Sequence, residues 1–141
     1  MAFLFDTDAI SELLRPRPAA DYIKWLLNVP REEQFTSAVV IGELYKGAYR
    51  SQARKRHLAN IEQRILPAIT VLPYDTGTAK IFGKIRASLE EAGAVLPDAD
   101  IQIAATALCH DLELVTGNLQ HFIRIGGLRL NTILSDSRPK Q

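Results

Sequence analysis

The chain has 141 residues, of which 47% are hydrophobic and 23% charged, the balance of one globular domain with a buried core. Its 17 basic and 16 acidic residues leave a formal net charge of +1, so any nucleic-acid binding must depend on local patches. The single cysteine, Cys109, excludes an internal disulfide and a multi-cysteine metal site, and we expect it to be buried on a helix. No apolar run approaches the length of a membrane span, so we expect a cytoplasmic protein without a membrane segment.

Short apolar segments alternate along the chain with segments of helical periodicity. In chain order, the predicted strands are 2–5, 34–40, 69–72 and 112–116. The helices predicted between them are 9–15, 20–29, 41–50, 54–66, 76–91 and 101–110. Strands that alternate with helices are typical of a parallel sheet covered on both faces, which predicts an α/β fold. We expect one domain over residues 1–134 and a flexible C-terminal tail over 135–141.

Carboxylates occur on apolar segments near the predicted carboxyl ends of the strands, where parallel α/β sheets bind their ligands. Asp6 follows the first strand, Glu43 lies early in the helix after the second, and Asp100 begins the helix before the fourth. Each acid also has a local explanation, as a turn residue, as a helix cap or as the partner of a nearby lysine. Taken together, three acids at one predicted edge are harder to explain in this way.

Clustered carboxylates repel one another and resist dehydration, and a divalent cation relieves both costs. Because the donors are oxygens, without thiolates or an obvious pair of histidines, they favour Mg²⁺ or Mn²⁺ over zinc. Such sites commonly activate water and neutralise charge on a phosphodiester during hydrolysis. The residues by themselves therefore predict an acid-lined metal site on an α/β sheet.

Four motifs in order resemble those of PIN-domain ribonucleases, specifically the VapC/FitB-like toxins of bacterial type II toxin–antitoxin pairs. The segment FLFDTDAIS resembles the opening strand with the first acid, and FTSAVVIGELYKGA resembles the segment of the second acid. LPDADIQIAATAL resembles the segment of the third acid, and LVTGNLQHF, followed by IGGLRL, resembles the closing segment. Each motif alone is a weak pattern, but four in order with fitting gaps are a strong signal that runs nearly end to end.

This resemblance implies a three-layer α/β/α domain with a central parallel sheet and a Mg²⁺-dependent endoribonuclease that hydrolyses RNA with a metal-activated water. It places metal binding on Asp6, Glu43 and Asp100, and it makes Asn118 a further catalytic residue that orients water or substrate. Asn118 stands where relatives frequently carry Asp, and Asp8 stands where they usually carry Asn. The residues expected to cap helices or to support the ligands are Asp8, Asp98, Thr116 and Ser37.

Two surface features bear on the partners of such an enzyme. The basic segment RSQARKRH is either a solvated helix turn or a patch that steers RNA phosphates, and its candidates are Arg50, Arg54, Lys55 and Arg56. Arg15 and Arg17 form a second candidate patch on the same terms. The resemblance also implies a homodimer and a small antitoxin whose C-terminal segment lies along helices near the site. Trp25 and Leu26 could line that groove or belong to the core.

Two other classes of protein fit parts of the sequence. In a haloacid-dehalogenase-like phosphatase, Asp6 would be the nucleophile and Asp8 the acid of an Asp-x-Asp signature. The chain is short for that family, and it lacks a convincing downstream lysine and acidic pair. A degenerate PIN domain that acts only as a binding module is the non-enzymatic alternative, against which the intact Asp6, Glu43 and Asp100 argue.

Overall fold

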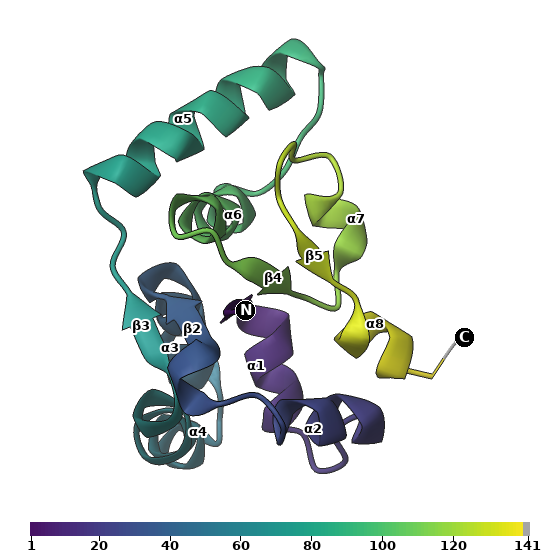
Figure 1. The fold of residues 1–141 in the computed structure, drawn as a ribbon. Coiled ribbons are helices and arrows are strands. Elements are labelled where there is room, and N and C mark those ends of the chain that lie inside the picture. Colours follow the sequence, from purple (N-terminus) through teal and green to yellow (C-terminus); the bar gives the residue numbers. More distant parts are fainter. Residues whose placement is uncertain (140–141) are drawn as a thin grey trace.

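The computed structural model describes residues 1–139 and shows a parallel sheet covered by helices (Figure 1). The strands are β1 Phe3–Phe5, β2 Gln34–Ser37, β3 Thr70–Leu72, β4 Glu113–Val115 and β5 Leu130–Asn131. Their order across the sheet is β3-β2-β1-β4-β5, and every neighbouring pair is parallel. The order reverses at β1, so the carboxyl ends of β1, β2 and β4 border a crevice of the kind that holds ligands in open α/β sheets.

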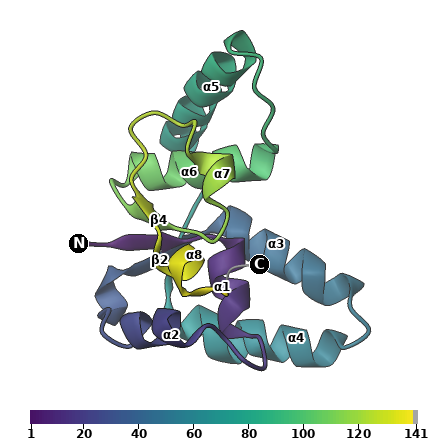
Figure 2. The same cartoon turned by 90° about the vertical axis from the view of Figure 1, so that its right-hand side faces the viewer.

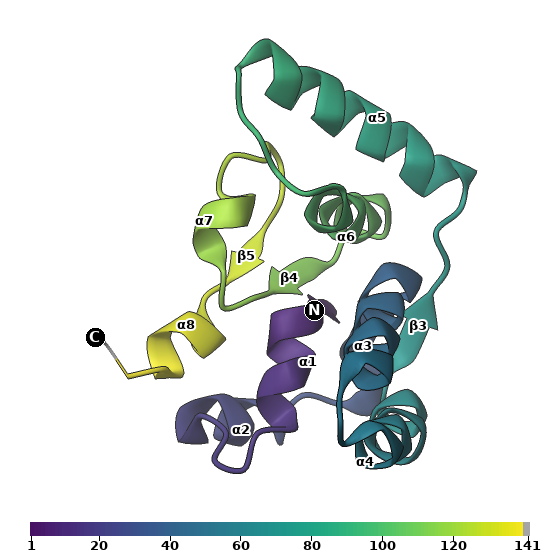
Figure 3. The same ribbon diagram turned by 180° about the vertical axis from the view of Figure 1, so that it is seen from behind.

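Helices form two layers around this sheet. The α-helices are α1 Thr7–Leu13, α2 Ala20–Leu26, α3 Ala38–Arg50, α4 Arg54–Asn60, α5 Thr76–Glu91, α6 Asp98–Cys109, α7 Leu119–Phe122 and α8 Ile133–Ser137. Seen along the sheet, α5, α6 and α7 lie above it and α1, α2 and α4 lie below it (Figure 2). Seen from behind, α3 lies next to α4, and α8 lies next to α2 (Figure 3). The arrangement confirms the predicted three-layer α/β/α fold.

No helix in the described part of the chain is both long and apolar enough to cross a membrane.

The core lies between the sheet and its two helical layers, where Leu4 and Leu114 of the central strands are fully buried. Helix α6 presents small side chains to its neighbours, and Ala104 and Ala107 are buried there. Small residues let α6 pack closely against both α5 and β4. The strand ends are therefore supported by a packed interior.

Polar residues at the strand ends begin the helices that follow. The Asp6 carboxylate accepts a hydrogen bond from the Ala9 amide at 2.8 Å and so caps α1. The Ser37 hydroxyl caps α3 in the same way, through the Val40 amide at 3.1 Å. Each cap satisfies an amide that has no partner within its own helix. The strand-to-helix turns therefore place side-chain oxygens at the carboxyl edge of the sheet.

Three local features differ from the expectations drawn from sequence. Helix α3 begins at Ala38, inside the predicted second strand, because Ser37 caps it there. After α4, the chain continues as a π-helical segment (Ile61–Ile65) and a short 3-10 turn, rather than as one α-helix up to residue 66. Cys109 is exposed at the end of α6, so the expectation that it is buried was wrong.

The C-terminal segment differs most from the expectation. Strand β5, which the sequence pattern did not predict, pairs with β4. Helix α8 then spans the expected boundary between domain and tail, and Arg138 after it makes ion pairs with Asp8 and Glu12. Residues 135–138 are therefore part of the fold, where the sequence led us to expect a tail. Residues 140 and 141 of that tail lie outside the described residues.

Candidate active site

A cavity of about 340 Å³ opens at the carboxyl edge of the sheet, where β1, β2 and β4 end. We name it the acid cavity, and it is lined by Asp6, Thr7, Asp8, Ser11, Glu43, Asp100, Ile103, Asn118 and Phe122. The four predicted catalytic residues, Asp6, Glu43, Asp100 and Asn118, come from four separate segments and all line this cavity. The fold thus brings them together, as expected from the parallel topology.

Asp6 is the most buried of the acids in the acid cavity, with 5% of its surface exposed. It ends β1 and caps α1, so the backbone positions its carboxylate from both sides. Its pKa is about 7 instead of 3.8, chiefly because burial disfavours the charged form. Hydrogen bonds from Thr116 and Ala9 act to lower the pKa, whereas the carboxylates of Asp8 and Asp100 raise it. A cation in the cavity would favour the charged form of Asp6.

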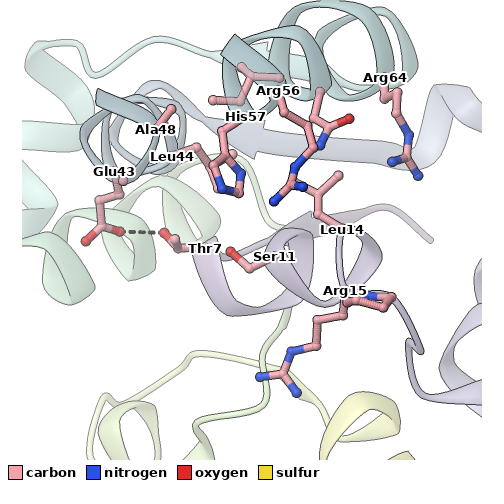
Figure 4. A pocket seen from close by; sticks show the side chains of 14 residues that line it. Thr7, Ser11, Leu14, Arg15, Glu43, Leu44, Ala48, Arg56, His57 and Arg64 are labelled. Carbon is pink, nitrogen blue, oxygen red and sulfur yellow. Dashed lines mark hydrogen bonds between the residues drawn. The ribbon is translucent and has the colours of Figure 1, made fainter. Parts of the chain in front are cut away.

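Glu43 and Asp100 each have a hydrogen-bonding partner at the acid cavity. From α1, the Thr7 hydroxyl donates to Glu43 Oε1 (Figure 4). From α7, His121 Nδ1 lies 2.7 Å from Asp100 Oδ2. From the sequence, Thr7 was a candidate helix cap, and His121 lay near the predicted edge of the site but was expected to pack or cap rather than to bind metal. Thr7 directly follows Asp6, so its position was a usable signal, whereas the contact of His121 depends on how α7 packs against α6.

Asp8 is paired with an arginine 130 positions further along the chain. Arg138 donates to both Asp8 carboxylate oxygens, at 2.8 and 2.9 Å, and to Glu12 Oε1 at 2.8 Å. Glu12 is only 2% exposed, and although burial acts to raise its pKa, hydrogen bonds from Arg138 and the Ala19 amide outweigh burial and lower it. The charge of Asp8 is therefore balanced within the protein. Sequence reasoning missed Arg138 because it lies in the expected tail.

Three residues expected to support the ligands have different surroundings. Thr116 is buried after β4, where its hydroxyl acts to lower the pKa of Asp6 and accepts a hydrogen bond from the Asn118 amide at 2.9 Å. Ser37 is buried and its hydroxyl caps α3, while Asp98 forms an ion pair with an arginine of α5. Thr116 therefore contacts the candidate site, whereas Ser37 and Asp98 do not line the acid cavity.

The donors of the acid cavity fit a hard divalent cation, because they are carboxylate and amide oxygens. Neighbouring carboxylates contribute to the raised pKa of Asp6, and a cation would relieve this repulsion. Within residues 1–139, no three Asp, Glu, His or Cys side chains lie close enough together to hold an ion as they stand. Glu43 and Asp100 are each engaged with another side chain through one oxygen, Oε1 and Oδ2, so the second oxygen of each carboxylate is the one that would share an ion.

A second and larger cavity, of about 860 Å³, adjoins the acid cavity (Figure 4). It lies between α1, α3 and the segment that begins with α4, and it shares Thr7, Ser11 and Glu43 with the acid cavity. We name it the arginine cavity after the three arginines that line it, Arg15, Arg56 and Arg64. Its apolar lining includes Leu14, Leu44, Ala48 and Ile61.

The basic residues singled out in the sequence divide between two surfaces, except Arg17, which lines neither. Arg56 and Arg15 line the arginine cavity. Arg50, Arg54 and Lys55 instead line a shallow hollow around the turn before α4, which Arg56 also borders. The predicted basic patch is therefore split, and only its Arg56 end reaches the neighbourhood of the acids.

Trp25 and Leu26 are half-buried and pack against the core. The ring centroid of Trp25 lies 5.1 Å from that of Phe3, in an edge-to-face arrangement. Neither residue lines the acid cavity or the arginine cavity. The structure thus favours the core interpretation of these two residues over the groove interpretation.

The fold and the acid cavity agree with comparisons to known proteins. A family model described as the PIN domain matches residues 3–128. Because this match covers most of the chain, the protein belongs to the PIN-domain family. Nucleases of this family generally depend on a divalent metal, which agrees with the oxygen donors of the acid cavity.

Individual relatives lie among the VapC and FitB toxins, as the sequence motifs predicted. The toxin FitB of Neisseria gonorrhoeae is 36% identical over 124 residues, which cover 84% of this chain and 89% of FitB. The tRNA(fMet)-specific endonuclease VapC of Shigella flexneri is 35% identical over 129 residues, which cover 92% of this chain and 96% of that protein. The solved structure of DNA-bound VapBC from Salmonella typhimurium matches with a TM-score of 0.83 and 33% identity, over 93% of this chain and 97% of that chain.

Proposed function

We propose that this protein is the toxin of a type II toxin–antitoxin pair and that it hydrolyses RNA as an endoribonuclease. The acid cavity carries the proposal, because it gathers Asp6, Glu43, Asp100 and Asn118 at one edge of the sheet. The names of two relatives support it, since one is a toxin and the other an endonuclease specific for a transfer RNA.

We assign metal binding to Asp6, Glu43 and Asp100, with Mg²⁺ as the natural ion and Mn²⁺ as a substitute. When bound, the ion would activate a water molecule and neutralise charge on the phosphodiester. Asp6 supplies a carboxylate at the end of β1, and Glu43 and Asp100 supply theirs from α3 and α6. Asn118 is an uncharged amide, so its role is to orient water or phosphate by hydrogen bonding.

The surroundings of Asp8 argue against the phosphatase alternative. In that chemistry Asp6 attacks phosphorus, and Asp8 donates a proton to the leaving group. Both carboxylate oxygens of Asp8 accept hydrogen bonds from Arg138, so neither is directed at a leaving group. Asp8 therefore fits a supporting role, in which it belongs to an ion pair at the edge of the acid cavity.

The proposal includes a small antitoxin as partner, a homodimer and an action in the cytoplasm, where RNA is available. The similarity to VapBC, which was solved bound to DNA, supports a partner of this kind. An adjacent gene for a small DNA-binding protein would support the pairing further.

Cleavage of RNA by the purified protein, free of antitoxin, tests the proposed activity. We expect cleavage with Mg²⁺ and none with a chelator. Asp6→Asn and Asp100→Asn should each slow cleavage by more than about a hundredfold, because even residues that only support a metal ligand cost up to about that much. Asp21→Asn, the same change at an exposed position of α2, should cleave like the parent.

Three outcomes would contradict the assignment. Cleavage by Asp6→Asn at the parental rate would remove Asp6 from the metal site. Binding of RNA without cutting, across several metals and substrates, would favour a binding module. A phosphoryl group trapped on Asp6 would support the phosphatase.

A further inference from the structure

We propose that the arginine cavity binds the single-stranded RNA segment next to the bond that is cut, with arginines at its phosphates and apolar side chains against its bases. The identity of the ligand rests on the proposed ribonuclease function. The site itself rests on three observations of the structure, which are its charge, its apolar lining and the residues that it shares with the acid cavity.

The charge of the arginine cavity favours a polyanion. Arg15, Arg56 and Arg64 are exposed, and only Glu43 among the lining residues is acidic. In residues 1–139, neither Arg56 nor Arg64 forms an ion pair, while Arg15 lies 3.7 Å from Glu12. Two guanidinium groups are therefore available for phosphates, and their binding would release counterions from the RNA.

The apolar lining favours single-stranded over double-stranded RNA. Leu14, Leu44, Ala48 and Ile61 make up the apolar lining, and Leu14 keeps the most exposed surface for a base because the other three are buried. Bases in a duplex are stacked and paired, so they cannot reach into a concave site of this kind, whereas the bases of a single strand can. Apolar and guanidinium surfaces then accept the faces of the bases with little dependence on sequence.

The two cavities share three lining residues, so a strand held in one lies beside the other. Thr7, Ser11 and Glu43 line both. Figure 4 shows Arg56 and His57 projecting from α4 toward Ser11, with Glu43 and Thr7 on one side and Arg15 on another. A strand that passes from the arginines toward Glu43 would therefore bring its backbone to the acids.

A glycine in the wall of the arginine cavity allows a test that changes its shape and leaves its charge intact. A Cβ at Gly47 of α3 would meet no atom within 4 Å, so a longer side chain there fits the helix and enters the cavity. Gly42 of the same helix is equally open but does not line the cavity, so Gly42→Gln is the matched control for Gly47→Gln. Both changes should preserve or raise stability, because glycine is a poor helix former.

Binding of a fluorescein-labelled single-stranded RNA of mixed sequence, measured by anisotropy in chelator, gives the readout without cleavage. We expect Gly47→Gln to weaken binding about tenfold, the loss expected when one base no longer stacks. Gly42→Gln should bind like the parent. Equal affinities for all three proteins, or no binding by the parent, would overturn the proposal.

A second pair of variants tests the charge of the cavity. Arg56→Gln with Arg64→Gln should reduce the slope of log affinity against log salt concentration by about 1.4, because each phosphate contact with a single strand contributes about 0.7. Lys80→Gln with Lys84→Gln removes the same charge from the exposed face of α5 and should leave the slope unchanged. An equal change in both would show only an effect of net charge and would overturn the assignment to the arginine cavity.

These measurements separate the inference from the proposed function, because binding is read in chelator and cleavage in Mg²⁺. Cleavage that persists while the variants bind RNA like the parent would leave the ribonuclease intact and remove the arginine cavity from substrate binding. If those variants also escaped inhibition by a co-expressed antitoxin, the cavity would be a protein-binding surface, and the RNA assignment would be wrong.

Discussion

The raised pKa of Asp6 predicts that the acid cavity lowers the stability of the metal-free protein near neutral pH. In the unfolded chain an aspartate loses its proton near pH 3.8, whereas Asp6 in the folded protein keeps its proton up to about pH 7. Between these values the folded state binds more protons than the unfolded state, so the free energy of unfolding falls as pH rises. The shift from 3.8 to about 7 corresponds to a loss of about 4 kcal/mol, at about 1.4 kcal/mol per pKa unit.

The variant Asp6→Asn should abolish this loss, since an amide has no proton to release and asparagine also caps helices well. We expect the variant and the parent to be similarly stable near pH 4, and the variant to be more stable by up to about 4 kcal/mol near pH 8. Urea denaturation followed by circular dichroism measures both, in chelator and at one protein concentration. Asp21→Asn, at an exposed position, keeps Asp6, so the difference between its stability and that of the parent should be small and the same at both pH values.

A stability difference between Asp6→Asn and the parent that is the same at both pH values would refute the reasoning. It would mean that Asp6 titrates in the folded protein as it does in the unfolded chain. The burial and the neighbouring carboxylates that raise its pKa would then have no net effect.

Two ion pairs and one histidine give further predictions on stability and on metal binding. Arg138→Gln leaves the buried Glu12 carboxylate without its cation. We expect the free energy of unfolding, measured by urea denaturation, to fall by about 2 kcal/mol, which is below the range for fully buried pairs because Arg138 is partly exposed. Arg129→Gln, which removes a pair with an exposed aspartate, should leave stability almost unchanged, and equal losses would contradict the importance of burial. His121→Ala should weaken Mg²⁺ binding about tenfold in calorimetric titrations, because Asp100 loses the group that orients it; unchanged affinity would remove His121 from this role.

Features that depend on local pattern could be predicted from the sequence. Strand β1 is uniformly apolar and is followed directly by Asp6, and the small residues of α6 begin at Ala104, four positions after Asp100. Parallel topology then requires the strand ends to meet at one edge, which is why the acid cavity contains the predicted residues. Their roles as metal ligands stay a prediction, since Glu43 and Asp100 now engage other side chains.

Features that depend on contacts between distant segments could not be predicted. Strand β5 has two residues and exists because it pairs with β4, so no periodicity marks it. Arg138 lies in a polar segment whose composition is typical of a tail, and nothing local points to Asp8 as its partner. Arg54 and Arg56 are close in sequence, yet the winding of α4 directs only Arg56 into the arginine cavity.

The ion pairs of Arg138 have a consequence for the order in which the site is completed during translation. The ribosome adds Arg138 130 residues after Asp8, so Glu12 and Asp8 exist in the nascent chain long before their cation. Gly117 keeps the space for it, because a Cβ there would overlap Arg138 Nη1 and Asp8 Oδ2. A nascent chain that has reached residue 134 already contains Asp6, Glu43, Asp100 and Asn118, but its Glu12 carboxylate is still without the guanidinium that balances it.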